Sequence, residues 1–209
     1  MKICRIQDSR FSQADVVELI KASFAQWQER GLESSLLKLT PDSFAEKTAN
    51  DIVLVAIDER SDTLCGTTSF SMLQDKQGKR YAYNKFSAVI STTKQKGIGS
   101  LLLDCEKQMA LSENCSYILS DTCIHAKWSV NWHKKNGFKI IALDSFKSND
   151  YYSYIFRLQL EEPSCWSSNR YCKRRFLKSW LKTRLKYNSK GELSPCGQII
   201  QHLRSWTMH

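Results

Sequence analysis

The chain has 209 residues, 42% of them hydrophobic and 25% charged, which is the balance of a globular protein long enough to bury a full core. Its net charge of +10 indicates acidic partners or surfaces. The first residues lack the apolar segment of a secretory signal, and no stretch is apolar over the length of a membrane span. We therefore expect a cytoplasmic protein rather than a secreted or membrane-spanning one.

The first half of the chain predicts two helices among four strands. A helix over 12–32 carries its apolar residues at helical spacing. A shorter helix over 40–49 has Thr40 as its cap and Pro41 at its first helical position. Apolar and β-branched runs bounded by turn residues predict strands over 2–6, 51–58, 64–73 and 81–91.

The second half continues the alternation. A helix over 100–114 is followed by a buried strand over 117–124. The next helix, over 126–138, ends at Gly137, a natural helix terminator. Two strands complete the set, over 139–146 and 151–160. This order predicts an α/β fold with a mixed central β-sheet flanked by helices on both faces.

The eight cysteines are scattered, and no Cys-x-x-Cys pair is present. The nearest metal-like grouping is Cys123-x-His125. Structural zinc sites need several ligands at recognisable spacing. We therefore expect free thiols in a reducing compartment and no bound metal.

The segment "STTKQKGIGS", residues 91–100, places a glycine-rich loop between a strand and a helix. One interpretation is a solvated turn. The other is a phosphate cradle, because the first turn of a helix offers unpaired N–H groups and the positive end of the helix dipole. Lys94 and Lys96 would add charge, and Gln95 a neutral donor. The segment is neither a Walker A loop nor a complete dinucleotide-binding fingerprint.

A second segment, "SVNWHKKNGF" over 129–138, follows about thirty residues later. Together, "KQKGIG" and this segment resemble the two signature motifs of the GNAT superfamily of N-acetyltransferases. Lys94, Gly97 and Gly99 stand in the family's Q/R-x-x-G-x-G/A loop. The second motif is matched by Ser129, Trp132, His133, Lys135, Gly137 and Phe138. The resemblance covers about residues 1–160 and implies a GNAT-like fold.

The resemblance also implies a site for acetyl-CoA as co-substrate. The backbone near Val89, with Ser91 beside it, would pair with the pantetheine arm on a bulged strand. Amides from Gln95 to Ser100, including that of Ile98, would hold the pyrophosphate. Trp132 would pack beside pantetheine. A splay between the strands at 88–91 and 117–121 would admit the thioester.

His133 stands where the family usually has a tyrosine as general acid for the leaving thiolate. An unperturbed imidazole, with a pKa of ~6.5, can deliver such a proton; the alternative is a histidine that only caps the helix end or contacts phosphate. Two departures from the family pattern weaken expected contacts: Lys94 replaces Gln or Arg, and Ala126 stands where many members have an Asn that bonds the cofactor.

The general base that takes the proton of the acceptor amine is not fixed by the sequence. Asp121 and His125 flank the expected acceptor end of the fifth strand. Glu29 and Glu33 lie near the end of the first helix, and a water chain is a further option. Cys123 and His125 would project to the same side if their strand continued, which makes them the one nucleophile pair worth checking.

Basic residues are concentrated near the carboxyl end. Residues 163–209 contain ten Lys and Arg against one acid, whereas residues 1–162 contain 21 bases and 20 acids. We predict a GNAT acyltransferase domain over 1–162 and a basic amphipathic helical extension over 163–209. The extension either packs on the domain or a second subunit, lies through 170–187 on the inner face of an anionic membrane, or binds nucleic acid or an acidic carrier protein.

The sequence thus predicts an acyl-CoA-dependent N-acyltransferase, in its simplest form transferring acetyl from acetyl-CoA to a primary amine by direct attack. The acceptor would be an amine-bearing small molecule, such as an envelope or amino-sugar metabolite. The alternative is a non-catalytic acyl-CoA-binding module, or a membrane or nucleic-acid interaction module, on the same fold.

Overall fold

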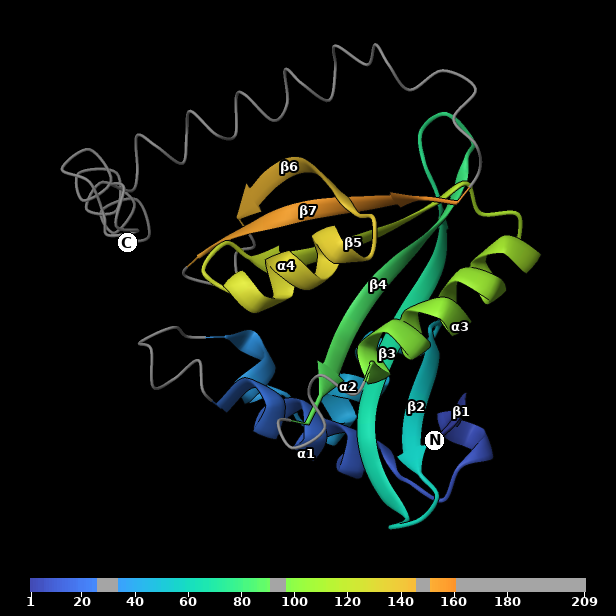
Figure 1. Cartoon of the computed structure of the whole chain (residues 1–209), viewed down its shortest axis with the longest axis vertical. Helices are drawn as coiled ribbons and strands as arrows, with labels where there is room; N and C mark the ends of the chain where they lie inside the picture. The colour runs from blue at the N-terminus through green and yellow to red at the C-terminus, as the bar shows by residue number, and fades with distance from the viewer. Residues whose placement is uncertain (26–33, 91–96, 146–150, 161–209) are drawn as a thin grey trace, which may run out of the picture.

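The computed structural model describes residues 1–25, 34–90, 97–145 and 151–160 (Figure 1). The predicted extension over 163–209 and its boundary at 162 lie outside these ranges. Seven strands form one sheet in the order β1-β2-β3-β4-β5-β7-β6. The strands are β1 (Lys2–Arg5), β2 (Ile52–Asp58), β3 (Thr63–Gln74), β4 (Arg80–Val89), β5 (Tyr117–Cys123), β6 (Lys139–Ser145) and β7 (Tyr152–Gln159).

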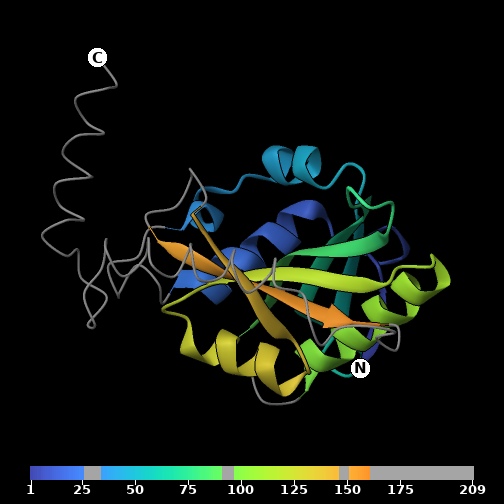
Figure 2. The ribbon, with the colours of Figure 1, turned by 90° about the horizontal axis from the view of Figure 1, so that it is seen from above.

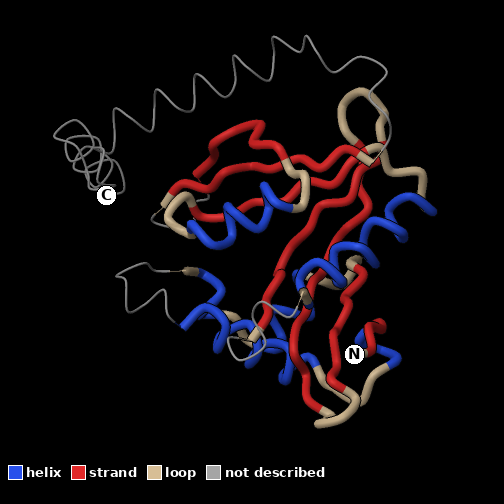
Figure 3. Tube along the Cα trace, in the orientation of Figure 1, coloured by secondary structure: helices blue, strands red, loops and turns tan. Residues whose placement is uncertain are grey.

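Within the described ranges, four α-helices cover the two faces of this sheet. α1 (Gln13–Phe24) and α2 (Pro41–Lys47) lie on one face, and α3 (Ile98–Ser112) and α4 (Lys127–Lys135) lie on the other (Figures 1 and 2). Two short 3₁₀ helices, η1 (Ile6–Asp8) and η3 (Ser35–Lys38), were not predicted. The α/β fold with a mixed sheet and helices on both faces is confirmed, and Figure 3 shows its layers.

The helices on the first face begin at side-chain caps. The Ser12 hydroxyl accepts from the Asp15 amide at 3.3 Å, and the Asp15 carboxylate accepts from the Ser12 amide at 2.7 Å. Thr40 and Ser43 make the same reciprocal pair at the start of α2, with Pro41 at the first helical position, as predicted. Such capping boxes satisfy amides that the helix itself leaves unpaired.

Each face of the sheet has its own hydrophobic core. Val16, Ile20 and Phe44 of α1 and α2 pack on one face against β2 residues such as Val55. On the other face, a larger core unites α3 and α4 with the strands; its members include Leu54, Phe70, Ala82, Ile98, Leu102, Ile118, Val130, Phe138 and Phe156. This larger core fixes α3 and α4 side by side across the junction of β4 and β5.

Candidate active site

Among the strands that the structure describes, β4 and β5 form the only parallel pair, and they separate soon after they meet. Tyr81, Ala82 and Tyr83 pair with residues 117–119, and the ladder then stops. The two strands diverge beyond this point, as Figure 1 shows. From the sequence we expected the opening to begin at residue 117 of β5. It begins later, because residues 117–119 are paired with β4. The opening is bordered by 84–89 of β4 and 120–123 of β5.

A β-bulge lies in β4 at this opening. Thr67 and Ser69 of β3 pair with Ala88 and Lys85, so β4 has one residue more than its partner between them. Phe86 occupies the bulge with φ at 49°, a left-handed conformation that is unusual for a bulky side chain. The resemblance placed a bulged strand over 87–91, and the bulge lies slightly earlier, at residues 85–87.

The backbone of Val89 borders the opening. Val89 pairs with Gly66 of β3, and the next amide, that of Ile90, donates to the Cys65 carbonyl at 3.1 Å. Hydrogen-bonded and non-bonded pairs alternate along an antiparallel ladder. The N–H and C=O of Val89 therefore point to the other edge of β4, toward β5, where an extended ligand would find them.

The first turn of α3 opens beside these strands. Gly97 is the N-cap of α3 with φ at 77°, and its carbonyl accepts from the amides of Ser100 and Leu101, both at 3.0 Å. A Cβ built on Gly97 meets no described atom within 4 Å, so space lies open above it. The first amides of the helix, those of Ile98 and Gly99, have no partner within the helix. This geometry suits an anion.

Gly99 serves a different purpose from Gly97. Its Cβ would lie 3.2 Å from Nε1 of Trp132, so the missing side chain lets α4 pack closely on α3. The Ser100 hydroxyl donates to Oδ1 of Asn136 at 3.1 Å and ties the same two helices together. Trp132 therefore lies against the start of α3, beside the place where the sequence expected pantetheine.

Several predicted residues lie outside the described ranges. They are Ser91, Lys94, Gln95 and Lys96 of the predicted cofactor loop, and Glu29 and Glu33 among the candidate bases. For these six residues the roles stay predictions. Val89, Gly97, Ile98, Gly99, Ser100 and Trp132 are described, and they gather where β4, α3 and α4 meet at the opening.

His133 lies inside the core between α4 and the sheet, and it is only 5% exposed. Its Nε2 lies 3.0 Å from the Ser120 hydroxyl of β5, and its Nδ1 lies 2.8 Å from the Ser129 carbonyl. The ring stacks on Phe156 with centroids 4.4 Å apart and meets Phe138 edge-on at 5.1 Å. Both ring nitrogens are thus engaged within the protein.

Burial sets the charge of this imidazole. Desolvation lowers the pKa of His133 to about 4, although the bond to the Ser129 carbonyl opposes the shift. The ring is therefore neutral at pH 7, with Nδ1–H donating to Ser129 and Nε2 accepting from Ser120. A neutral imidazole is a poor proton donor. These surroundings weigh against His133 as the general acid, a role that stays a prediction.

Asp121 lies on the face of β5 opposite to His133, and its side chain contacts β4. Its Oδ1 accepts from the Tyr83 hydroxyl at 2.9 Å, which bridges the two strands where their ladder ends. Burial is the main cause that raises the pKa of Asp121 above its ordinary value; hydrogen bonds from Tyr83 and Ser153 oppose the rise, and the charge of Asp144 adds to it. A carboxylate so placed is a stronger base than one in water.

The turn after β5 carries the other residues that the sequence singled out. β5 ends at Cys123, so His125 does not continue the strand, and its side chain is half-buried. The Cys123 thiol accepts from the His125 backbone amide at 3.4 Å, and burial raises the pKa of that thiol to about 11. Such a thiol is inert at neutral pH, so the Cys123–His125 pair is not an activated nucleophile.

His125 and Ala126 have distinct places in this turn. Burial lowers the pKa of His125 below its ordinary value. Ala126 is the N-cap of α4 and makes no side-chain cap, and it packs with Cys123 and Tyr151 instead. The position where many family members carry a cofactor-bonding Asn is therefore apolar and buried in this chain.

Sequence reasoning missed Tyr83, Asn84 and Glu106. Glu106 is fully buried, and it occurs in the predicted helix at core spacing with Leu102 and Leu103, a signal available from the sequence. Tyr83 and Asn84 gave no such signal, because Asp121 lies 38 residues from Tyr83 and Glu106 lies 22 residues from Asn84 in the chain.

No group of three or more potential metal-ligating side chains occurs within the described ranges. The five cysteines described there, Cys4, Cys65, Cys105, Cys115 and Cys123, are free thiols. Among the described helices, none is both long and apolar enough to cross a membrane.

Solved structures share this fold. The protein smu.2055 of Streptococcus mutans UA159 is 22% identical, with a TM-score of 0.60 over 77% of this chain and 100% of that one. A GNAT-family acetyltransferase of Staphylococcus aureus Mu50 is 16% identical, with a TM-score of 0.59 over 77% and 99%. An aminoglycoside 6'-N-acetyltransferase complexed with coenzyme A is 14% identical, with a TM-score of 0.57 over 79% and 100%. No curated protein matches the sequence.

The sequence profile of the acetyltransferase (GNAT) family matches residues 14–138. That range runs from α1 to the end of the second signature motif, and it includes the opening between β4 and β5. The family resemblance predicted from the two motifs is thus confirmed. The chain belongs to the GNAT family of acetyltransferases.

Proposed function

We propose that this protein is an acetyl-CoA-dependent N-acetyltransferase that acylates a primary amine by direct attack. The observation that carries the proposal is the left-handed N-cap at Gly97, with open space above it and the first amides of α3 beside it. A pyrophosphate fits there because the donors and the positive end of the helix dipole converge on one point. Family membership and the separation of β4 and β5 support the same conclusion.

Bound acetyl-CoA would supply an activated acetyl thioester. The Val89 backbone, directed toward β5, would hold the extended pantetheine arm, and Trp132 would close the side of the site formed by α4. The acceptor would enter from the face of β5 that carries Asp121, opposite His133. The two substrates would therefore meet between β4 and β5.

Asp121 is our proposed proton acceptor. The amine must lose a proton before its nitrogen attacks the thioester carbonyl carbon, and Asp121 takes that proton. The second proton leaves the nitrogen as the carbon–sulfur bond breaks, and it neutralises the coenzyme A thiolate. Tyr83 holds the carboxylate in place through its hydroxyl, and burial raises the pKa of Tyr83, which keeps that hydroxyl protonated.

The acceptor's identity, the cytoplasmic location and the role of residues 163–209 stay proposals. An amine-bearing small molecule fits the carboxylate on the acceptor face. The basic extension would bring the enzyme to an anionic surface, with the membrane through 170–187 as the first candidate and nucleic acid or an acidic carrier protein as the second.

The matched pair Gly97→Asn and Gly97→Asp tests the proposal. Asn and Asp both tolerate a positive φ and have the same shape, so they differ in charge alone. Calorimetric titration should show coenzyme A binding to the wild type and, within several-fold, to G97N. Binding to G97D should fall at least ~10-fold, because a carboxylate would face the pyrophosphate.

Release of free thiol from acetyl-CoA in the presence of an amine panel completes the test. Thiol release that depends on the amine supports the enzyme. If the wild type binds no coenzyme A, the proposal fails, and equal binding by G97N and G97D would remove Gly97 from the cradle.

A further inference from the structure

The bulge in β4 decides which groups of that strand reach the opening. Before the bulge, Ala82 packs on the α3 face and Asn84 bonds Glu106 of α3. After it, Ala88 packs with α1 and α2, and Val89 packs on the α3 side. Side chains alternate between the two faces of a strand, so the one extra residue in the bulge reverses which positions of β4 face α3. The direction of the Val89 backbone therefore depends on the bulge keeping its shape.

A polar network holds this bulge from the α3 face. The Asn84 carboxamide uses all its donors and its acceptor: Nδ2 donates to the Thr68 hydroxyl at 2.8 Å and to Oε2 of Glu106 at 2.6 Å, and Oδ1 accepts from the Ser87 hydroxyl at 2.7 Å. The Thr68 and Ser87 hydroxyls are themselves 2.7 Å apart. The bond between Ser87 and Asn84 spans the bulge.

Glu106 anchors the network in the core. It is 0% exposed, and its other oxygen, Oε1, has no hydrogen-bond partner among the described residues. Burial raises the pKa of Glu106 to about 8, against the opposing effects of Asn84 and Lys107. The carboxyl group is therefore mostly neutral at pH 7, and it serves as an acceptor for Asn84 without placing a full charge in the apolar core.

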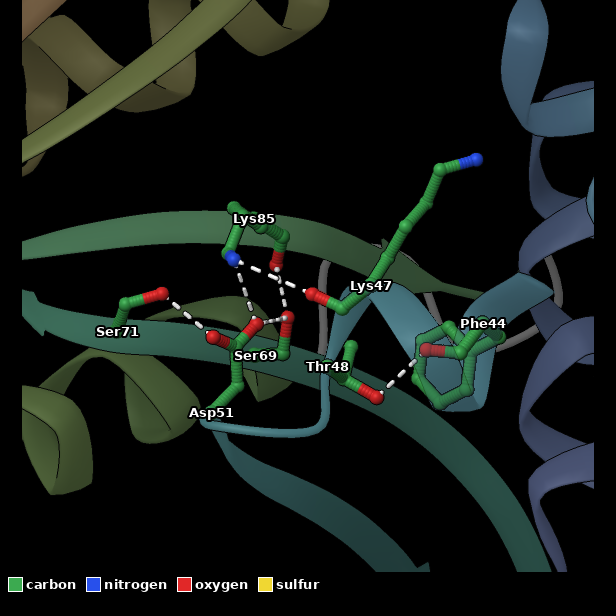
Figure 4. Close-up of polar contacts among 7 residues, drawn as sticks. All are labelled: Phe44, Lys47, Thr48, Asp51, Ser69, Ser71 and Lys85. Atoms are coloured by element: carbon green, nitrogen blue, oxygen red, sulfur yellow. Dashed lines mark hydrogen bonds and ion pairs between the residues drawn. The ribbon is translucent and has the colours of Figure 1, made fainter. Parts of the chain in front are cut away.

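The opposite face of the bulge is held by a different device. Lys85 extends toward α2, and its Nζ lies 2.8 Å from Oδ2 of Asp51, whose side chain is only 2% exposed (Figure 4). The Ser69 and Ser71 hydroxyls of β3 also donate to this carboxylate. Phe86 packs edge-on against Phe44 of α2, with ring centroids 5.4 Å apart. Lys85 and Phe86 are thus fixed to the α2 face, while Asn84 and Ser87 are fixed to the α3 face.

We propose that Asn84, held by Glu106, is a positioning residue that keeps the β4 bulge in the form required for acyl transfer. The inference rests on the proposed function, because it assigns the bulge a part in that reaction. Asn84 touches no reacting atom. It fixes the backbone that borders the opening, and Glu106 carries that restraint into α3, the helix whose first turn forms the phosphate cradle.

The tests use Asn84→Ala, Ser87→Ala and the pair Glu106→Leu and Glu106→Gln. Gln keeps a neutral acceptor oxygen for Asn84, whereas Leu has nearly the same size but no acceptor. We expect N84A and E106L to lower kcat ~10-fold or more and E106Q to stay within ~3-fold of the wild type. Ser87 is exposed, so S87A will fold; it should lower kcat several-fold.

The affinity for coenzyme A separates positioning from general damage. The main anchor of the cofactor is the start of α3, so N84A and E106L should bind free coenzyme A within ~3-fold of the wild type while kcat falls. A fall in kcat matched by an equal loss of coenzyme A affinity would contradict positioning. Wild-type kcat in both N84A and S87A would also overturn it.

Hydrogen exchange of the backbone amides at 84–89 tests the restraint without turnover. Exchange should accelerate in N84A and E106L and stay near the wild-type rate in E106Q. Unchanged exchange in all variants would refute the network even if the enzyme is active. Absence of thiol release in the wild type, with accelerated exchange in N84A, would instead overturn both the proposed function and the catalytic part assigned to the bulge.

Discussion

Two ionisable side chains flank β5, the buried His133 against one face and the partly buried Asp121 against the other, and desolvation drives both toward their neutral forms. His133 lies on the α4 face, where one ring nitrogen contacts Ser120 of β5 and the other contacts the Ser129 carbonyl of α4 itself. Asp121 lies on the other face and bonds across the β4–β5 junction to Tyr83. Neutrality removes the proton that an imidazolium would donate, whereas a raised pKa strengthens a carboxylate as a base. The same physical effect thus favours proton chemistry on the Asp121 face and packing on the His133 face.

The replacement of Asp121 by Asn tests the acceptor face and should have the largest effect. Asn keeps the acceptor for the Tyr83 hydroxyl but cannot take a proton. We expect kcat to fall ~10²–10³-fold, the range typical of a lost general base. Steady-state kinetics with the best amine of the panel measures it, and activity within ~3-fold of the wild type would exclude Asp121 as the base.

The pH dependence of kcat/KM in the wild type and in D121N tests whether Asp121 acts in its ionised form. Asp121 is active when ionised, so kcat/KM of the wild type should fall as the pH drops through a pKa above the ordinary carboxyl value. The residual activity of D121N should lack this acid limb.

The replacement of Asp121 by Asn should raise the stability of the folded protein although it lowers activity. A carboxyl whose pKa is raised by folding is ionised in the folded protein only at a cost, so stability is lost as the pH rises from the unfolded to the folded pKa. D121N should therefore melt ~2 °C or more above the wild type at pH 7, and a lower Tm would indicate a structural role.

His133→Phe tests the other face, and we expect a smaller effect. Phe fits the aromatic surroundings formed by Phe138 and Phe156 but leaves the Ser120 hydroxyl and the Ser129 carbonyl without the ring nitrogens. The Tm should drop, because the buried Ser120 hydroxyl and the Ser129 carbonyl each lose a partner. The kcat of the folded protein should change less than ~10-fold, whereas loss of a general acid would lower it ~10²–10⁴-fold. A loss in that larger range, with an altered pH profile, would restore His133 as the acid.

Gly99→Ala should produce the smallest change, and it probes how closely the cofactor side is packed. The new methyl group would press on Trp132, while Ala favours the helix over Gly by ~1 kcal/mol. We expect a Tm within a few degrees of the wild type and a few-fold loss of coenzyme A affinity. The W132F background should remove that loss, which a double-mutant cycle measures. Equal effects in both backgrounds would show that Gly99 is not required for packing against Trp132.

Local signals in the sequence determined much of this molecule. The cap Thr40, the first helical residue Pro41 and the terminator Gly137 depend on neighbouring residues alone. Thr40 and Pro41 lie where they were predicted, and Gly137 follows the C-cap Asn136 of α4 with φ at 86°. The order of strands and helices follows from the spacing of apolar residues. Gly97 and Gly99, together with the second motif, identified the family, because a motif is a local pattern that survives when overall identity is low.

The tertiary structure decided what each ionisable group does. Burial against Phe156 and Phe138 lowers the pKa of His133, which its place in the motif did not indicate. Tyr83 meets Asp121 across 38 residues of chain, and Asn84 meets Glu106 across 22. A pKa depends on desolvation and on the groups that surround a side chain in space. Those surroundings exist only after β4, β5, α3 and α4 have packed together, so no local pattern in the sequence could specify them.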